Sequence, residues 1–177
     1  MLTPSMQPPS PPDPNPRPLL IRYDKYGEPF AIRSYHGSDR PALLAFYEAF
    51  QPKRAAQGLP PTGADRITRW LDGILGVGIH LLALRDGALI GHALLVPTGE
   101  EGVAEYAVFL RQDQRGHGVG TEFNRVAVTR AAADGLKRLW LTVEPHNRAA
   151  IRSYERVGFR FVPGTVFSPE AEMVMDL

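Results

Sequence analysis

The stretch QRGHGVG places three glycines, Gly116, Gly118 and Gly120, at alternate positions directly before an amphipathic helix pattern. Glycine has no Cβ, so consecutive backbone N–H groups in such a turn can converge on one anion. The unpaired N–H groups at the start of the following helix would strengthen the attraction. Arg115 and Arg111 add positive charge beside it. The pattern therefore predicts a phosphate site, and a diphosphate could be shared between several of these donors.

Two common nucleotide motifs do not fit this turn. The dinucleotide pattern G-x-G-x-x-G requires a third glycine at the position of Thr121, and the P-loop requires a lysine after the glycines. A tight strand-to-helix turn without any ligand is the structural alternative. A phosphate-binding or nucleotide-binding scaffold of another kind also stays open on these residues alone.

Two spaced motifs together resemble those of a known family. R-G-H-G-V-G at 115–120 is similar to the R/Q-x-x-G-x-G/A signature of the GCN5-related N-acetyltransferases, the GNAT superfamily. N-R-A-A-I-R-S-Y-E-R-V-G-F at 147–159 resembles the second signature of that family. The expected order of elements over 30–177 also resembles the family fold. The resemblance implies an acetyl-CoA-dependent N-acetyltransferase that acts on a primary amine of a small molecule or a protein.

The resemblance also implies where acetyl-CoA would bind. The strand before the glycine turn would splay from the next parallel strand, and the pantetheine arm would lie in the gap against backbone groups of 108–110. The N–H groups of 115–120 would hold the pyrophosphate, with Thr121 at the helix start, and Asn147 would fasten the arm. The residues so implied in cofactor binding are Val108, Phe109, Leu110, Arg115, Gly116, His117, Gly118, Val119, Gly120, Thr121, Asn147, Ala150 and Tyr154.

Tyr154 and Glu105 are the predicted catalytic residues. The resemblance places Tyr154 at the thioester sulfur, where a phenol could protonate the leaving thiolate. The alternative is a packing tyrosine at helical spacing from Ile151 and Val157. The family often places a glutamate on the strand that carries Glu105, where it would accept the proton of the amine. Glu105 and Val108 need a bulge between them to share one face of that strand.

Other groups could remove the proton instead, and an ordered water would need none of them. Glu100 and Glu101 lie in a predicted turn, where solvated acids are common. His92 lies in an apolar strand and is expected to be a hydrogen-bonded core residue. His117 lies inside the glycine turn, where solvent exposure is expected, and His146 precedes Asn147. The histidines show no metal-ligand spacing, so no metal is inferred.

The acceptor amine is expected to lie against the two predicted helices around 50–70 and the loop PTGEEG. Glu100 and Glu101 would favour a cationic amine, whereas Lys53 and Arg54 would favour a substrate with an acidic group. A non-catalytic acyl-CoA sensor of the same fold is the alternative function. A leaving-group acid has no use in a pure sensor, which argues against it.

The elements that must position these residues follow from hydrophobic periodicity. FAIRSY at 30–35 predicts a strand, and Ser38 is expected to cap a helix with Pro41 in its first turn. Asp86-Gly87 predicts a two-residue hairpin between apolar strands. The remaining pattern extends this to the order β-α-α-β-β-β-α-β-α-β-β. The pattern therefore predicts the α/β class, as a single domain with a mixed central sheet and helices on both faces, and the resemblance to the GNAT superfamily implies the acyl-CoA N-acyltransferase fold.

Composition limits the remaining choices. The 177 residues carry a net charge of +1, with 22% charged and 44% hydrophobic residues and no cysteine. Eight prolines in 1–18 predict a disordered tail before a domain at 19–177. The balanced charge argues against a nucleic-acid partner, and no apolar run is long enough for a membrane span. A cytoplasmic protein is expected, and a strand late in the chain is compatible with a homodimer.

Overall fold

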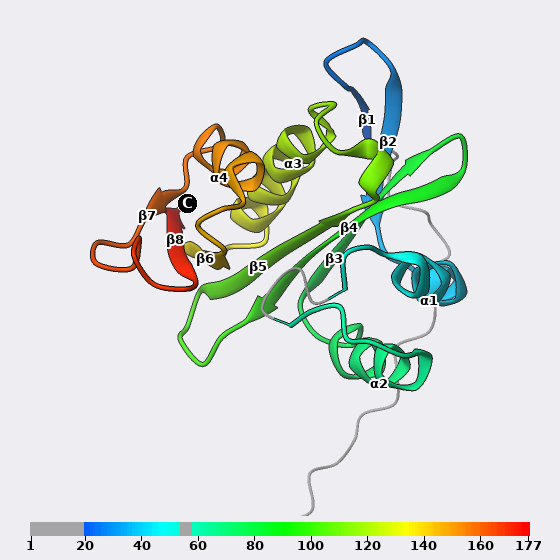
Figure 1. The fold of residues 1–177 in the computed structure, drawn as a ribbon, viewed down its shortest axis with the longest axis horizontal. Coiled ribbons are helices and arrows are strands. Elements are labelled where there is room, and N and C mark those ends of the chain that lie inside the picture. The colour runs from blue at the N-terminus through cyan, green and yellow to red at the C-terminus, as the bar shows by residue number, and fades with distance from the viewer. Residues whose placement is uncertain (1–19, 54–57) are drawn as a thin grey trace, which may run out of the picture.

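The computed structural model describes residues 20–53 and 58–177. These residues form one eight-stranded sheet with helices on both faces (Figure 1). The predicted proline-rich tail at 1–18 lies outside the described residues. The strands are β1 Leu20–Tyr23, β2 Pro29–Ser34, β3 Ile79–Arg85, β4 Ala88–Pro97, β5 Val103–Leu110, β6 Arg138–Val143, β7 Arg160–Phe161 and β8 Ala171–Asp176. The helices are α1 Arg40–Ala49, α2 Ala64–Ile74, α3 Val119–Ala133 and α4 Arg148–Glu155, with 3₁₀ turns η1 Gly37–Asp39 and η2 Gln112–Gln114.

The sheet is mixed, as the sequence predicts. Its strand order is β1-β2-β3-β4-β5-β6-β8-β7, and all neighbours are antiparallel except β5 and β6. A parallel pair needs a crossover connection, and α3 supplies it between β5 and β6. The strands at the two edges are β1 and the two-residue β7, so the late strand β8 is not an edge.

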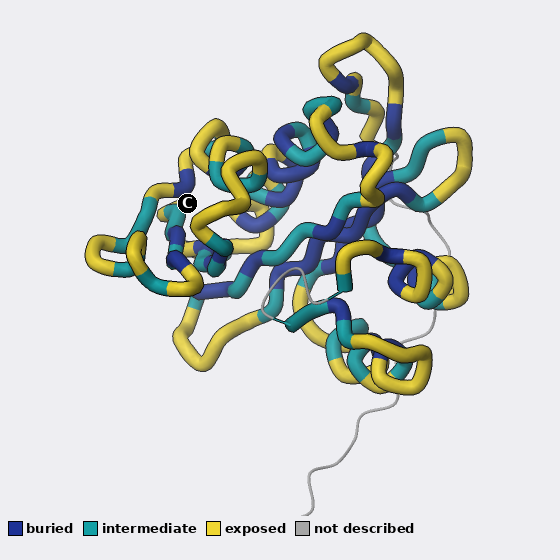
Figure 2. The backbone as a smooth tube through the Cα atoms, viewed as in Figure 1, coloured by how far each residue is buried: buried dark blue, intermediate teal, exposed yellow. Residues whose placement is uncertain are grey.

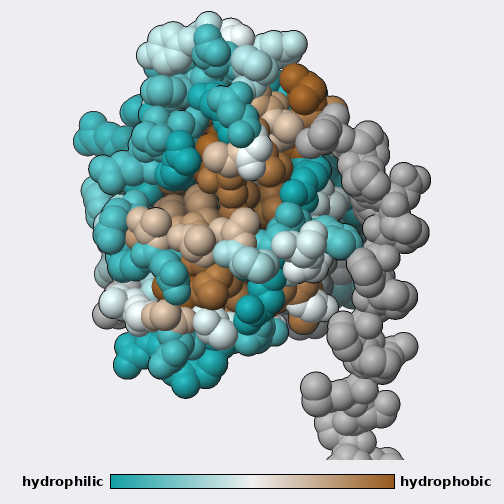
Figure 3. Space-filling model, turned by 90° about the vertical axis from the view of Figure 1, so that its right-hand side faces the viewer, coloured by the Kyte–Doolittle hydropathy of each residue, from teal (hydrophilic) through white to brown (hydrophobic). Residues whose placement is uncertain are grey.

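Each face of the sheet has its own apolar core (Figure 2). On one face α1 and α2 pack against β3, β4 and β5 through residues such as Leu43, Tyr47 and Leu71. On the other face α3 and α4 cover the sheet, with Phe123 and Tyr154 among the buried residues. Viewed from the right-hand side of Figure 1, hydrophobic residues occupy the middle of the surface and hydrophilic residues surround them (Figure 3). Helices therefore cover both faces of the sheet.

Local chemistry explains which turns the sequence predicts. Asp86 and Gly87 have φ values of 51° and 76°, as a type I′ hairpin requires, so that prediction is confirmed. Pro41 lies in the first turn of α1, also as predicted. The predicted Ser38 cap is wrong, because a capping box formed by His36 and Asp39 starts η1 before the helix.

Strand β1 is an element that the sequence pattern does not indicate. It pairs with β2 through a tight turn in which the Asp24 carboxylate accepts the N–H groups of Tyr26 and Glu28 at 2.9 and 3.1 Å. Gly27 occupies the left-handed region there, with φ 85°. A four-residue strand beside so many prolines carries too little periodicity to be recognised.

The parallel pair β5–β6 separates after three residues. Paired positions are Val103–Arg138, Ala104–Leu139 and Glu105–Trp140. From Tyr106 to Leu110, β5 continues without a partner on that side while remaining paired with β4 on the other. The predicted splay is therefore present, and its apex lies at the Glu105–Trp140 pair.

Within 20–53 and 58–177 no helix is long and apolar enough to cross a membrane. In the same residues no group of three or more His, Cys, Asp or Glu side chains could hold a metal ion.

Candidate active site

The glycine turn presents a row of unpaired backbone donors. Gly116 and Gly118 have φ values of 75° and 88°, and Gly118 is the N-cap of α3 without a side-chain cap. In the described part of the chain, the N–H groups of Gly116 through Gly120 have no hydrogen-bond partner. Positive φ is the conformation that glycine adopts without strain, so the turn itself favours glycine at 116 and 118. Five successive donors at a helix start are suited to a diphosphate.

Arg115 does not point into this turn, which corrects the prediction. Its backbone N–H donates to the Gln112 carbonyl at 3.2 Å, and its guanidinium donates to the carbonyls of Leu110 and Gln51 at 3.2 and 2.8 Å. The guanidinium also lies 5.3 Å from the ring centroid of Phe50, and burial lowers the pKa of Arg115. The side chain therefore ties the end of β5 to the segment after α1.

Arg111 is also engaged. Its guanidinium forms two hydrogen bonds of 2.7 Å with the carboxylate of Asp113, so its charge is compensated locally. Neither arginine next to the glycines thus offers a free guanidinium to a phosphate. The attraction for an anion comes from the backbone donors and the helix start.

Thr121 lies in the first turn of α3, at the helix start as predicted, but its side chain is engaged within the protein. It is buried, and its hydroxyl lies 3.2 Å from the Ser153 hydroxyl on α4. Ser153 also accepts the amide N–H of Asn124 at 2.9 Å, and Asn124 accepts the hydroxyl of Tyr106 at 2.7 Å. This network joins β5, α3 and α4, so the Thr121 side chain holds the two helices together beside the turn.

The hydrogen-bond phase of β5 shows which backbone groups face the splay. Arg111 donates to Ile90 at one end and Thr98 donates to Val103 at the other, at 2.9 and 3.0 Å. The register between β4 and β5 is continuous, so the backbone N–H and C=O groups of the odd-numbered residues of β5 point toward β4. The backbone groups of Val108 and Leu110 therefore face the gap.

Among the three residues predicted to contact the arm, Phe109 is the one whose backbone groups do not face the gap. Its backbone pairs with His92 of β4, and its side chain is 2% exposed in the core beneath α1 and α2. The Leu110 carbonyl already accepts from Arg115, and the Leu110 N–H, which has no acceptor among the described residues, faces the gap. Of the three residues predicted to bind the arm, Val108 and Leu110 are therefore the two whose backbone groups face the gap.

Glu105 lies at the apex of the splay, opposite Trp140. No bulge interrupts β5, so Glu105 and Val108 point to opposite faces of the sheet. Glu105 shares its face with Phe109, which packs against α1 and α2. The carboxyl group is half-buried, and desolvation raises its pKa above the ordinary value. A raised pKa brings a carboxylate closer to the range of a general base.

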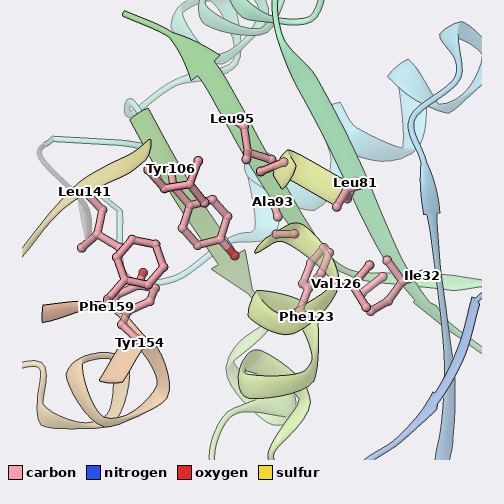
Figure 4. Close-up of a cluster of buried hydrophobic side chains, with 14 of the residues drawn as sticks. Ile32, Leu81, Ala93, Leu95, Tyr106, Phe123, Val126, Leu141, Tyr154 and Phe159 are labelled. Carbon is pink, nitrogen blue, oxygen red and sulfur yellow. The ribbon is translucent and has the colours of Figure 1, made fainter. Parts of the chain in front are cut away.

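Tyr154 lies on the opposite face, in α4. Its side chain is 7% exposed and packs against the rings of Tyr106 and Phe159, with centroids 6.2 and 5.7 Å away (Figure 4). Burial raises the pKa of Tyr154 well above that of a free tyrosine, so the phenol stays protonated. The hydroxyl has no hydrogen-bond partner among the described residues, which leaves it free to bond a ligand.

Asn147 is the N-cap of α4. Its side-chain oxygen accepts the N–H of Ala150 at 3.2 Å, which fixes the orientation of the amide. The amide NH₂ has no partner among the residues described and can donate to a carbonyl. Ala150 therefore supports the predicted site through its backbone N–H.

The histidines have separate roles. His92 is fully buried: its Nδ1 lies 2.6 Å from the Tyr47 hydroxyl and its Nε2 lies 3.0 Å from His80, so it is the core residue that the sequence predicts. His117 is half-buried against Tyr26, with ring centroids 5.3 Å apart, although solvent exposure was expected for it. His146 is exposed and lies 3.2 Å from Glu144.

The charges expected to select an acceptor are less free than the sequence indicates. The Lys53 ammonium donates to the carbonyls of Tyr47 and Glu48 at 2.6 and 2.7 Å, so it caps the end of α1. Arg54 lies outside the described residues. Glu100 and Glu101 are exposed in the β4–β5 turn.

Three residues that the sequence analysis did not select share the face of Glu105. Trp140 donates its indole N–H to Glu172 at 3.0 Å, and Thr142 is paired with Glu172 across β6 and β8. The Thr142 hydroxyl is buried without a partner among the described residues. The alternation of side chains in RLWLTV places Trp140 and Thr142 on the face opposite the core leucines. Only the register of the sheet shows that Glu105 lies on that same face.

Comparison with known proteins places these features in a family. The family model "Acetyltransferase (GNAT) family" matches 43–159. The L-methionine sulfoximine/L-methionine sulfone acetyltransferase of Pseudomonas paraeruginosa is 30% identical over 136 residues, covering 73% of this chain and 79% of that protein. The mycothiol acetyltransferase of Streptomyces avermitilis is 37% identical over 79 residues, which are 44% of this chain and 26% of that protein.

Solved structures share the fold. The GNAT domain of S. lividans PAT superposes with a TM-score of 0.74 at 18% identity, covering 90% of this chain and 97% of that one. A phosphinothricin acetyltransferase from Sinorhizobium meliloti in complex with AcCoA has a TM-score of 0.66 at 20% identity, covering 84% and 88%. The chain belongs to the acetyltransferase (GNAT) family. It is an acyltransferase, an acetyl-CoA-dependent N-acetyltransferase.

Proposed function

We propose that the chain acetylates the α-amino group of a small amino acid whose side chain ends in a polar tetrahedral sulfur or phosphorus centre. The observation that carries this acceptor class is the 30% identity to the methionine sulfoximine/sulfone acetyltransferase over most of both chains. The aligned length includes more than the cofactor motifs, so the similarity extends to segments that can contact the acceptor.

The N–H groups of Gly116 to Gly120 would hold the diphosphate of acetyl-CoA. Val108 and Leu110 would bond the amide-rich arm as an added strand bonds a sheet edge. Asn147 would donate its free amide NH₂ to a carbonyl of the arm. The fit rests on unpaired groups that lie along one path, from the glycine turn to the apex of the splay.

Glu105 and Tyr154 would act on the reacting groups from opposite faces of the sheet. Because the splay interrupts the sheet between these two faces, we infer that both side chains border one opening there. The half-buried carboxylate of Glu105 would accept the proton of the amine, directly or through water. The protonated phenol of Tyr154 would donate a proton or a hydrogen bond to the departing thiolate. Acetyl-CoA supplies the activated acyl group when it is bound.

Trp140, Thr142 and Glu172 would line the acceptor side of this opening. They share the face of Glu105, and the indole of Trp140 and the carboxylate of Glu172 are the polar groups on that side. Glu172 is held by the indole of Trp140, so its carboxylate is oriented before a substrate binds.

The test is the release of free CoA from acetyl-CoA with a panel of L-amino acids. The panel would contain methionine sulfoximine, methionine sulfone, phosphinothricin, methionine and lysine, with a thiol reagent as readout. We expect the first three to be turned over well above the rate of thioester hydrolysis.

The D-enantiomers serve as matched controls for the position of the amine. Acetylation of lysine or of a protein amine alone would overturn the acceptor class and leave the acetyltransferase activity standing. Mass spectrometry of the product would confirm that the acetyl group is on nitrogen.

A further inference from the structure

The β1–β2 hairpin packs on the glycine turn, although the two are far apart in the sequence (Figure 1). The backbone N–H of Lys25 donates to the carbonyl of His117 at 2.8 Å. The ring of Tyr26 meets the His117 ring edge to face, with centroids 5.3 Å apart. A Cβ added at Gly118 would lie 3.4 Å from the Lys25 nitrogen, so the two backbones are in contact.

This contact determines how the peptide between His117 and Gly118 is oriented. In a trans peptide the C=O and N–H bonds point in opposite directions. Because the His117 carbonyl points to Lys25, the Gly118 N–H points away from the hairpin and has no partner in the described residues. In the reversed orientation the carbonyl oxygen would occupy the place of that donor and would repel a phosphate.

The peptide needs such a restraint because its neighbours do not supply one. Gly116 and Gly118 flank His117, and glycine accepts φ of either sign at little cost. The glycines that open the turn for an anion therefore also allow the peptide to reverse. A hydrogen bond from outside the turn removes that freedom.

A second connection holds the hairpin in place. The carboxylate of Asp24 is buried and accepts a guanidinium N–H of Arg85 at 2.9 Å. Arg85 also donates to the side chain of Gln114 at 2.8 Å, in the 3₁₀ turn η2 just before the glycines. The hairpin is thus anchored to both the strand β3 and the approach to the turn.

We propose that Lys25 is a positioning residue whose backbone N–H presets the glycine turn for the diphosphate of CoA. The inference rests on the proposed binding of acetyl-CoA in that turn. It adds a role for the N-terminal hairpin, which neither signature motif contains.

The test uses a substitution that deletes one N–H group. Lys25 is the second residue of the turn closed by Gly27 N–H to the Asp24 carbonyl at 3.0 Å, a position that favours proline. Lys25→Pro removes the donor, and Lys25→Ala removes the side chain but keeps the donor. By calorimetry, Lys25→Pro should weaken CoA binding about five- to tenfold beyond any loss in Lys25→Ala, as one hydrogen bond typically contributes.

Pantetheine, which lacks the diphosphate, separates positioning from general damage. Its affinity, measured by competition, should be equal in Lys25→Pro and Lys25→Ala, because the arm lies along β5. Equal CoA affinities in the two variants would overturn the proposal, and so would a matching loss for pantetheine. If the wild-type protein binds no CoA, the proposed function fails and this inference fails with it.

Hydrogen exchange provides a test that does not depend on the variants folding. By linkage, a contact that favours the CoA-binding turn must itself be favoured by CoA. The Lys25 amide of the wild-type protein should therefore exchange more slowly when CoA is bound. An exchange rate that CoA does not change would contradict the proposal.

Discussion

The proposed acetyl transfer needs a base and an acid at the splay, and one residue is proposed for each, Glu105 for the base and Tyr154 for the acid. Burial raises the pKa of both Glu105 and Tyr154, but the consequences differ. A carboxylate with a raised pKa is a better base near neutral pH, and a phenol with a raised pKa remains a proton donor. The two groups lie on opposite faces of the sheet, so their proposed roles do not conflict.

Tyr154→Phe tests the acid. It keeps the ring that packs against Tyr106 and Phe159 and removes only the hydroxyl. We expect kcat to fall about 10- to 100-fold, with nearly unchanged CoA affinity by calorimetry. Wild-type turnover in this variant would assign Tyr154 to packing alone.

Glu105 gives a prediction for the pH dependence. The base must be ionised, so kcat/KM should decrease as the pH falls through a pKa that burial has raised above 4.5. Glu105→Gln should lower the rate and remove this acid limb. If the limb persists in the variant, the proton is accepted elsewhere. No decrease on the alkaline side should come from Tyr154, because its pKa lies far above 10.

Gly118→Glu tests the anion site. The substitution places a carboxylate at the turn and a side chain at a φ of 88°, so CoA binding should be lost. Gly118→Gln is the matched control, because it has the same strain without the charge. Both can be measured by calorimetry. A carboxylate variant that binds CoA as tightly as the amide variant would show that no phosphate lies there.

At the level of elements, α1 and α2 are tied to the sheet by a directional chain of hydrogen bonds. His80 Nε2 lies 3.0 and 2.9 Å from the carbonyls of Ile74 and Val77, so it carries the proton. His80 Nδ1 then accepts from His92, and His92 accepts the Tyr47 hydroxyl. The direction of each hydrogen bond in this series is thus fixed, and both imidazole rings are neutral.

This chain of hydrogen bonds makes the stability of the fold sensitive to acid. Desolvation lowers the pKa of His80 and of His92 in the folded state below 6.5, so between the folded and unfolded pKa values the unfolded chain binds more protons. Stability is then fully present above about pH 6.5 and is lost as the pH falls below it. In the double variant His80→Leu/His92→Leu, the free energy of unfolding measured with urea should change less between pH 8 and 5 than in the wild-type protein. Equal slopes in both proteins would contradict this account.

For the whole molecule, the cofactor should stabilise the fold by binding only the native state. At about one hundred times its dissociation constant, CoA should add ~2.7 kcal/mol and raise the melting temperature by about 5–10 °C. ATP and NAD at the same concentration should have a smaller effect, because neither has an arm to lie along β5. A larger shift with either nucleotide would refute CoA as the preferred ligand. Homodimerisation remains a prediction.

The sequence by itself determined the elements and the motifs. The spacing of apolar residues, the Asp86-Gly87 turn and the two signatures are local properties, so they predict the α/β fold and most of the donors at the glycine turn. The resemblance to the second family signature also points to Tyr154 and Asn147, and both lie in or directly before one helix.

Only the tertiary structure decided which groups face one another. The hydrogen-bond phase of β5 directs the backbone groups of Phe109 away from the gap beside β5. The Arg115 side chain is directed away from the predicted phosphate site, and the contact of Lys25 with His117 joins segments that are far apart in the sequence. Each depends on strand register or on a contact between residues far apart in the chain. A one-residue shift in register reverses which way every group on a strand points, and no local pattern contains that information.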